Sequence, residues 1–385
     1  MQFIDQIFVL GKKLLMNLAG LVLPDWIVTI LSAVIGIVAI IVLALITMMY
    51  LTWLERKAIA RMQNRIGPNR VGKWGLLQPV ADAVKMLTKE DIVPERADKL
   101  IHFAAPILMM VPALLIFSVI PFGRGMTAVD LNIGVLFFIA ISSTTTIPIF
   151  MASWSSRNKY SILGGMRTAA QMISYEIPMV LAAVPVLLMA GSLSTNAIVH
   201  AQEGWLGLKW YAWTPCGLLG FLIFFLCGVA ECNRSPFDLP EAESEIIAGF
   251  HIEYSGMKFA LFYMAEFMNV FAIAGLTATL FLGGWQGPFL PSWVWFFVKV
   301  YALIFIMFWF RGTLPRFRVD QLMGFAWKFF LPLALINIFI AGYWTLAHGP
   351  LKVVFSLAAV ILSFMVFAQL NRKYLPEKRI YDYGD

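Results

Sequence analysis

The residues best suited to chemistry in this chain are acidic side chains between two strongly apolar stretches. Residues 230–245 place five carboxylates beside one arginine, Arg234; the acids are Glu231, Asp238, Glu241, Glu243 and Glu245. Acidic side chains are costly near hydrocarbon, so a cluster of them in a chain with 13% charged residues indicates a functional site. The cargo that such a cluster suits is a proton or a small cation.

Two more acids lie inside apolar stretches. Glu176 stands two residues before Pro178, whose missing N–H loosens the helical ladder and can admit water or a polar side chain. Glu266 lies about nine residues into its stretch, or about 13 Å deep at a rise of 1.5 Å per residue. Carboxylates that share a pocket titrate as a coupled set, so a change of charge at one carboxylate can be passed to the next along the series of acids.

Simpler roles stay open for these charges. Glu231 and Asp238 could pair with Arg234 and do nothing more. The three glutamates at 241, 243 and 245 could form a solvated helix start, since Pro240 suits a first helical position. Arg311 is either a topology anchor or a contact to a peripheral subunit. Lys299 either reaches the outer interface or has an internal partner.

The elements that must hold these acids are membrane-spanning helices. A composition of 60% hydrophobic residues and a mean hydropathy of +0.80 over 385 residues is far from that of soluble domains. The runs lack the alternation of a membrane barrel, so we predict an all-α, polytopic transmembrane helix bundle of about eight to nine spans. The apolar runs cover residues 27–50, 104–120, 133–154, 172–191, 215–231, 257–282, 293–310, 324–346 and 351–370.

The distribution of basic residues predicts how the bundle is oriented. One side carries 21 Lys and Arg against 5 on the other, and cytoplasmic loops retain such residues. We therefore expect an outward N-terminus and a cytoplasmic C-terminus. Residues 1–26 are predicted to form an outward-facing interfacial segment, residues 27–370 a single transmembrane domain with long inner loops at 51–100 and 232–257, and residues 371–385 a polar inner tail.

An amphipathic helix is predicted within the first inner loop, from Trp74 to Lys89. Leu77, Val80, Val84 and Leu87 follow helical spacing there, and Asp82 lies elsewhere around the helix. The stretch is either a basic loop resting on lipid headgroups or a docking floor that shapes a cavity between the membrane and a partner.

No residue pattern for a resident cofactor stands out. Cys216, Cys227 and Cys232 have no Cys-x-x-Cys spacing, and no histidine is near enough in sequence to suggest a metal site. A phosphate-binding loop, a nucleophile elbow and a His-Glu-x-x-His motif are missing from the sequence. We expect this chain to bind no metal, haem or iron–sulfur cluster by itself, and its charge of +7 to reflect topology rather than nucleic-acid binding.

Several motifs in order make the chain recognisable. They are Glu-Arg-Lys, Gln-Asn-Arg-Ile-Gly-Pro-Asn-Arg-Val-Gly, Leu-Gln-Pro-Val-Ala-Asp-Ala-Val-Lys, Tyr-Ser-Ile-Leu-Gly-Gly-Met-Arg with Ser-Tyr-Glu-Ile-Pro, and Asn-Arg-Ser-Pro-Phe-Asp-Leu-Pro-Glu-Ala-Glu-Ser-Glu. Between about residues 50 and 346 the sequence closely resembles the quinone-site membrane subunit (the H-type subunit) of proton-pumping NADH:quinone oxidoreductase, respiratory complex I. Related membrane-bound hydrogenases carry a similar component.

The resemblance implies a role for each group of residues. The positions that match the quinone tunnel and the interface with the hydrophilic arm are Glu55, Arg56, Lys57, Arg65, Asp82 and Arg311. The positions that match the proton-coupling acids are Glu176, Glu231, Asp238, Glu241, Glu243, Glu245 and Glu266, with Arg234 as a charge partner. The implied activity is quinone reduction coupled to proton translocation, with no catalytic residue that carries electrons in this chain.

The resemblance also implies partners and a location. Quinone would be the substrate, while FMN and iron–sulfur clusters would sit in partner subunits. The partners would be the hydrophilic-arm subunits that flank the terminal cluster, small and antiporter-like membrane subunits, and lipid. A bacterial inner membrane is expected, rather than a mitochondrial one. From the residues alone, a stand-alone proton-coupled transporter and a passive anchor for a peripheral hydrogenase stay as alternatives.

Overall fold

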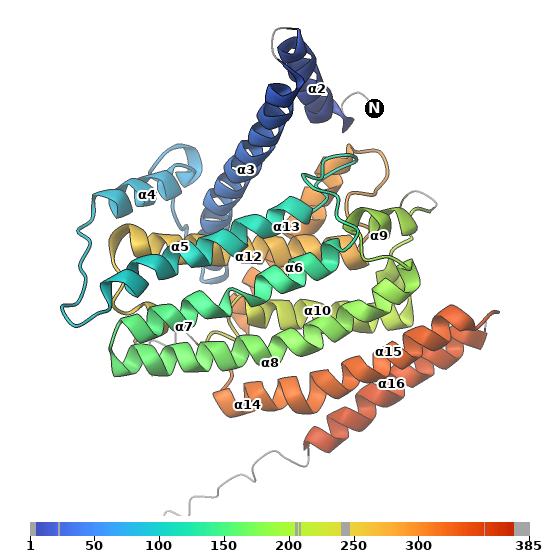
Figure 1. The fold of residues 1–385 in the computed structure, drawn as a ribbon. Helices are drawn as coiled ribbons and strands as arrows, with labels where there is room; N and C mark the ends of the chain where they lie inside the picture. Colours follow the sequence, from blue (N-terminus) through green and yellow to red (C-terminus); the bar gives the residue numbers. More distant parts are fainter. Residues whose placement is uncertain are drawn as a thin grey trace, which may run out of the picture.

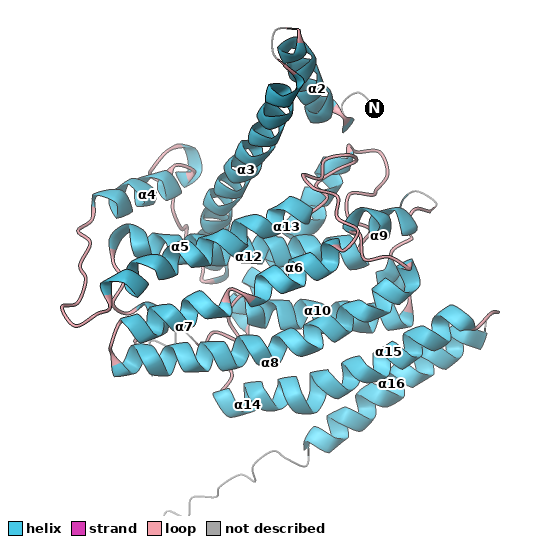
Figure 2. Ribbon diagram, viewed as in Figure 1, coloured by secondary structure: helices cyan, strands magenta, loops and turns pink. Residues whose placement is uncertain are grey.

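Helices form the regular structure of this chain. The computed structural model describes residues 5–21, 24–204, 207, 209–239, 247–349 and 351–372, and none of these belongs to a strand (Figure 2). Among the described residues, eight helices are long and apolar enough to cross a membrane, and the shorter apolar helix Pro215–Glu231 is a ninth candidate. The prediction of an all-α polytopic bundle is confirmed.

Figure 1 shows the helices in chain order, joined by connections of unequal length. The first half contains α2 (Ile7–Gly20), α3 (Asp25–Met62), α4 (Gln78–Thr88), α5 (Lys99–Ile116), α6 (Gly134–Ser143), α7 (Thr146–Ser155) and α8 (Lys159–Ala190). The second half contains α9 (Thr195–Ala201), α10 (Pro215–Glu231), α12 (Gly256–Phe281), α13 (Ser292–Thr313), α14 (Val319–Gly324), α15 (Leu331–Leu346) and α16 (Leu351–Arg372). A π-helical segment, Phe325–Phe330, joins α14 to α15.

The bundle has a buried centre and two helices with little cover. Figure 1 shows α3 leaning away from the central helices with α2 near its far end, while α16 lies along α15 on the opposite side. The most apolar window of α12 is 61% buried, against 6% for α3 and 11% for α16. Because apolar surface without cover is costly in water, α3 and α16 are the helices that most need lipid or another chain around them.

Helix α3 is longer than the apolar run that predicted it. The run ends at Tyr50, yet the helix continues to Met62 through the charged residues Glu55, Arg56 and Lys57. Thr52 and Glu55 are buried in this extension, which packs against α12 and α13. Successive residues of an α-helix turn by about 100°, so the three neighbouring charges point in three directions.

Helix α4 is fixed at its end by the start of α12. The Ser255 hydroxyl accepts a hydrogen bond from Ile92 N at 2.9 Å and donates one to Glu90 O at 3.2 Å. Gly256 has a φ of +57°, and a Cβ there would lie 3.2 Å from the Lys89 carbonyl oxygen, so this close approach requires glycine. The predicted helix is therefore present as Gln78–Thr88, and its place at the membrane surface stays a prediction.

The N-terminal helix is attached to the beginning of α13. Asp5 Oδ1 accepts a hydrogen bond from Ser292 N at 2.6 Å, and the Phe8 ring meets Trp293 edge-on with centroids 6.0 Å apart. These contacts place residues 5–8 at the same end of the bundle as the loop between α12 and α13.

That loop is held by a buried lysine on α13. Lys299 Nζ donates hydrogen bonds to Leu282 O at 2.6 Å, Gly284 O at 2.9 Å and Gln286 O at 2.6 Å. The Trp210 ring lies 5.0 Å from the ammonium group. Of the two roles open for Lys299 from the sequence, the structure supports the internal partner.

Replacing Lys299 with Met is expected to loosen this loop, because three carbonyl groups lose their donor at once. Each buried group left without a partner costs about 1–3 kcal/mol. We expect the thermal midpoint of the purified complex to fall by several degrees and protease to cleave the loop between α12 and α13 faster. The matched control is Lys13→Met at an exposed position of α2; equal behaviour of the two variants would contradict the role of Lys299.

Candidate functional site

The turn after α10 positions the first acidic residues. The helix ends at Glu231, and Asn233 takes a φ of +51°, a left-handed conformation that asparagine tolerates. Gln171 of α8 then donates from Nε2 to both Ala230 O and Phe237 O, each at 2.7 Å. Gln171 is fully buried, so this side chain fixes the turn against α8 and sets the positions of Arg234 and Asp238.

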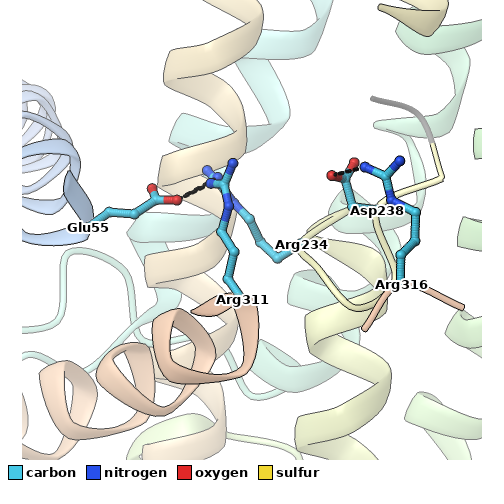
Figure 3. A network of polar contacts seen from close by, with 5 residues as sticks. All are labelled: Glu55, Arg234, Asp238, Arg311 and Arg316. Atoms are coloured by element: carbon cyan, nitrogen blue, oxygen red, sulfur yellow. Dashed lines mark hydrogen bonds and ion pairs between the residues drawn. The ribbon is translucent and has the colours of Figure 1, made fainter. Parts of the chain in front are cut away.

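Glu55 lies between two guanidinium groups from distant parts of the chain (Figure 3). Glu55 Oε1 of α3 forms an ion pair with Arg311 of α13, and Arg234 Nη1 lies 3.5 Å from the same oxygen. The side chains of Glu55 and Arg234 are 5% and 7% exposed, whereas that of Arg311 is 33% exposed. The site is therefore a buried charge cluster that can be reached from the side of Arg311.

Aromatic residues of α12 complete this cluster. The Phe267 ring centroid lies 4.2 Å from Arg234 Cζ, a cation–π contact. Tyr263, four residues earlier on the same helix, experiences the charges of Glu55, Arg234 and Glu266. The C-terminal part of α3, the turn after α10 and helix α12 thus meet at one place.

Asp238 forms a second ion pair at the same edge of the bundle (Figure 3). Arg316 Nη2 donates to Asp238 Oδ2 at 2.8 Å, and Asp238 is 7% exposed. Arg316 was not among the predicted site residues. The signal that identifies it is its place five residues after Arg311, in the polar connection between α13 and α14.

The acids around the end of α10 share one electrostatic neighbourhood. Cys232 experiences the charges of Glu231, Arg234 and Glu266, and burial raises the pKa of its thiol well above the usual value. Glu231 in turn experiences the charge of Glu176 on α8. The structure therefore brings together Glu55, Glu266, Glu231 and Glu176, which are far apart in the sequence.

The other predicted residues between positions 56 and 82 make contacts separate from this cluster. Arg56 Nη1 pairs with Asp82 Oδ2 at 2.5 Å, which ties α3 to α4, and both side chains are partly exposed. Lys57 lines an apolar cavity of about 560 Å³ with Trp53, Leu54, Ala58, Arg61, Met62 and Phe305. Arg65 is exposed and donates to Gln63 Oε1 at 2.8 Å.

Three predicted acids, Glu241, Glu243 and Glu245, lie outside the described residues. The chain is described again from residue 247. There His251 lies close enough to Asp238 to experience its charge, and burial lowers the pKa of the imidazole to about 4 despite that neighbour. His251 is therefore neutral near pH 7 and adds no positive charge beside Asp238.

This arrangement suits the uptake and release of protons. Within the described ranges, no three His, Cys, Asp or Glu side chains gather as a metal site requires. The prediction that the chain binds no redox cofactor by itself stays a prediction. Buried carboxylates that act on one another can take up and release protons as a set, and Glu55 with its two arginines can respond to charge that arrives from the side of Arg311.

Comparisons with known proteins give a consistent result. A family model described as NADH dehydrogenase matches residues 35–342. The H-type subunit of NADH-quinone oxidoreductase from Dehalococcoides mccartyi is 53% identical over 299 residues, which cover 78% of this chain and 83% of that protein. An H-type subunit of the same enzyme from Syntrophobacter fumaroxidans is 48% identical over 334 residues, or 84% of this chain and 99% of that protein. The corresponding protein of Anoxybacillus flavithermus is 48% identical over 325 residues, with 83% and 95% covered.

Proposed function

Because the chain belongs to the NADH dehydrogenase family, as an H-type subunit of NADH-quinone oxidoreductase (complex I), we propose that it forms the quinone-binding tunnel and couples quinone reduction to proton movement. The observation that carries this proposal is the buried Glu55–Arg234–Arg311 cluster beside the acids of α10 and α12. The cluster links a position that a quinone head group can reach with carboxylates that can hold protons.

The head group of a quinone suits the polar side of this cluster. Its two carbonyl oxygens accept hydrogen bonds, and guanidinium groups donate them in a fixed, planar geometry. The partly exposed Arg311 provides such donors beside Glu55. A long isoprenoid tail needs apolar walls, which the uncovered apolar surface of the bundle and its neighbours can supply.

Reduction of the quinone adds negative charge beside this cluster, and protons are drawn toward that charge. The order of acids that the structure supports runs from Glu55 past Glu266 to Glu231 and then to Glu176. Asp238, paired with Arg316, lies at the entrance from the inner loops. Glu241, Glu243 and Glu245 continue the set by sequence. The charge shift would then bias antiporter-like subunits farther along the membrane.

The surface of the bundle supports partners on two sides. The inner loops and α4, whose Val84 and Leu87 residues are more than half exposed, form the face for hydrophilic-arm subunits that carry FMN and iron–sulfur clusters. The poorly covered helices α3 and α16 are the surfaces for small membrane subunits, antiporter-like subunits and lipid. The setting is the bacterial inner membrane, with the N-terminus outward and the C-terminus in the cytoplasm.

A photoreactive quinone analogue tests the proposed tunnel in the assembled complex. We expect light to attach the probe to peptides of this chain that contain residues 51–62 or 305–316, because these flank the Glu55–Arg311 pair. An excess of unlabelled quinone should abolish the labelling. If the probe attached exclusively to other subunits, in a complex that still reduces the analogue with NADH, this chain would not form the quinone tunnel.

A further inference from the structure

The span Gly134–Ser155 is interrupted halfway, between α6 and α7. Pro148 accounts for the break, because its ring crowds the carbonyl of Thr144 four residues earlier and it has no N–H to donate. Five consecutive residues at the break, 142–146, carry hydroxyl groups. Each of the first four hydroxyl groups donates a hydrogen bond to a carbonyl three residues earlier. The pairs are Ser142 to Ile139 O (2.9 Å), Ser143 to Ala140 O (2.9 Å), Thr144 to Ile141 O (2.7 Å) and Thr145 to Ser142 O (2.7 Å).

Two of these hydroxyl groups also face acids of the predicted proton path. Ser142 interacts with the carboxyl group of Glu231 on α10, and Ser143 interacts with that of Glu176 on α8. Ser142 and Glu231 are 4% and 7% exposed. Glu231 Oε2 is buried without a hydrogen-bond partner among the described residues, so one oxygen of this acid is available for another group.

We propose that Ser142 and Ser143 are positioning residues that bridge Glu231 and Glu176 at the break between α6 and α7. This inference rests on the proposed function, since it assigns the hydroxyl groups a task within the proton path. The two acids come from different helices, and the adjacent serines hold both at one turn. The bridge makes them a coupled pair, in which protonation of one changes the state of the other.

A hydroxyl group suits this task because it has one hydrogen and two lone pairs. With its hydrogen on the carbonyl three residues earlier, the serine accepts a hydrogen bond from an acid that carries a proton. When the acid is ionised, the same hydrogen turns to the carboxylate. The serine thus responds to the charge of each acid without gaining or losing a proton. A run of hydroxyl residues within an apolar span has this use in addition to donating hydrogen bonds to carbonyl groups where the helix is interrupted.

Paired Thr and Val substitutions test the bridge in the assembled complex. The Ser142→Thr and Ser142→Val variants have side chains of nearly the same shape, but only threonine carries a hydroxyl group, so effects of side-chain size are common to both. The same two substitutions are made at Ser143. We expect both Thr variants to keep the parent ratio of protons pumped per electron. We expect the Val variants to lose at least half of that ratio, while quinone reduction measured with an uncoupler falls less than twofold. If a Val variant does not assemble, Ser142→Ala or Ser143→Ala replaces it.

The controls separate this inference from the function on which it rests. Thr144→Val removes a hydroxyl group of the same run from an exposed side chain and should leave the ratio unchanged. Glu176→Gln removes one of the bridged acids. Normal pumping in the Glu176→Gln variant would overturn the proposed function itself. Loss of pumping in that variant, together with equal ratios in the Thr and Val variants, would overturn the bridge alone.

Discussion

Replacing Glu55 with Gln is expected to lower the NADH:quinone reductase activity of the assembled complex by about ten- to a hundredfold. The substitution keeps the shape of the side chain and removes the carboxylate between Arg234 and Arg311. Breaking a buried ion pair in this way costs about 3–5 kcal/mol, because a charge is left without compensation. NADH oxidation with a water-soluble artificial acceptor, which needs the hydrophilic arm alone, should be unchanged.

A matched control separates this effect from a general loss of charge. Asp91 pairs with Lys258 at 2.7 Å, and the Asp91 side chain is 50% exposed. Exposed pairs contribute about 0–1 kcal/mol, so Asp91→Asn should leave quinone reductase activity within about twofold of the parent complex. Equal losses in the Asp91→Asn and Glu55→Gln variants would indicate that the loss of any paired carboxylate lowers activity, rather than loss of the buried cluster.

The double variant Glu55→Gln with Arg311→Met distinguishes structure from quinone binding. It removes one carboxylate and one guanidinium group, so the net charge of the cluster returns to that of the parent, and the assembly yield should be higher than for Glu55→Gln alone. Quinone reduction should stay low, because the donor groups of Arg311 are also lost. Recovery of both yield and activity would assign the cluster a structural role and remove it from the quinone site.

The general architecture was readable in the sequence because apolar runs of about 20 residues have few alternatives in a membrane. The position at which α3 ends was not readable in the sequence. Glu55, Arg56 and Lys57 indicated a loop by composition, yet tertiary contacts keep them helical as far as Met62. Charge is a reliable guide to where a helix leaves hydrocarbon, and a poor guide to where it ends.

The acids of the site, Arg234 and Arg311 were predicted, but which acid each arginine pairs with was not, and Arg316 was not predicted at all. Arg234 stands three residues from Glu231 in the sequence, but it contacts Glu55, 179 residues away. Asp238 pairs with Arg316, 78 residues away. Such pairings depend on how α3, α13 and the turn after α10 pack, and a single sequence contains no signal for that. Ser142 and Ser143 did leave a signal, namely five consecutive hydroxyl residues, 142–146, shortly before Pro148 within an apolar span.

The second large effect is expected from acids that are farther from the quinone. Glu231→Gln and Glu266→Gln, made one at a time, should lower NADH-driven proton pumping about tenfold or more, since each amide keeps the shape of the acid but cannot exchange a proton. Quinone reduction measured with an uncoupler should fall less, because neither residue is in the Glu55–Arg311 pair. The ratio of protons pumped to electrons transferred in sealed vesicles measures the difference.

Glu203→Gln is the control for these two variants, because it changes an acid outside the path. Glu203 pairs with His200 and is 53% exposed at the end of the bundle away from the acidic turn. Its loss should leave the pumping ratio unchanged. If all three variants pumped as the parent complex does, the buried acids would not carry protons. Glu231 and Glu266 would then serve to balance the charge of Arg234 at the turn after α10, and the coupling route would have to lie in another subunit.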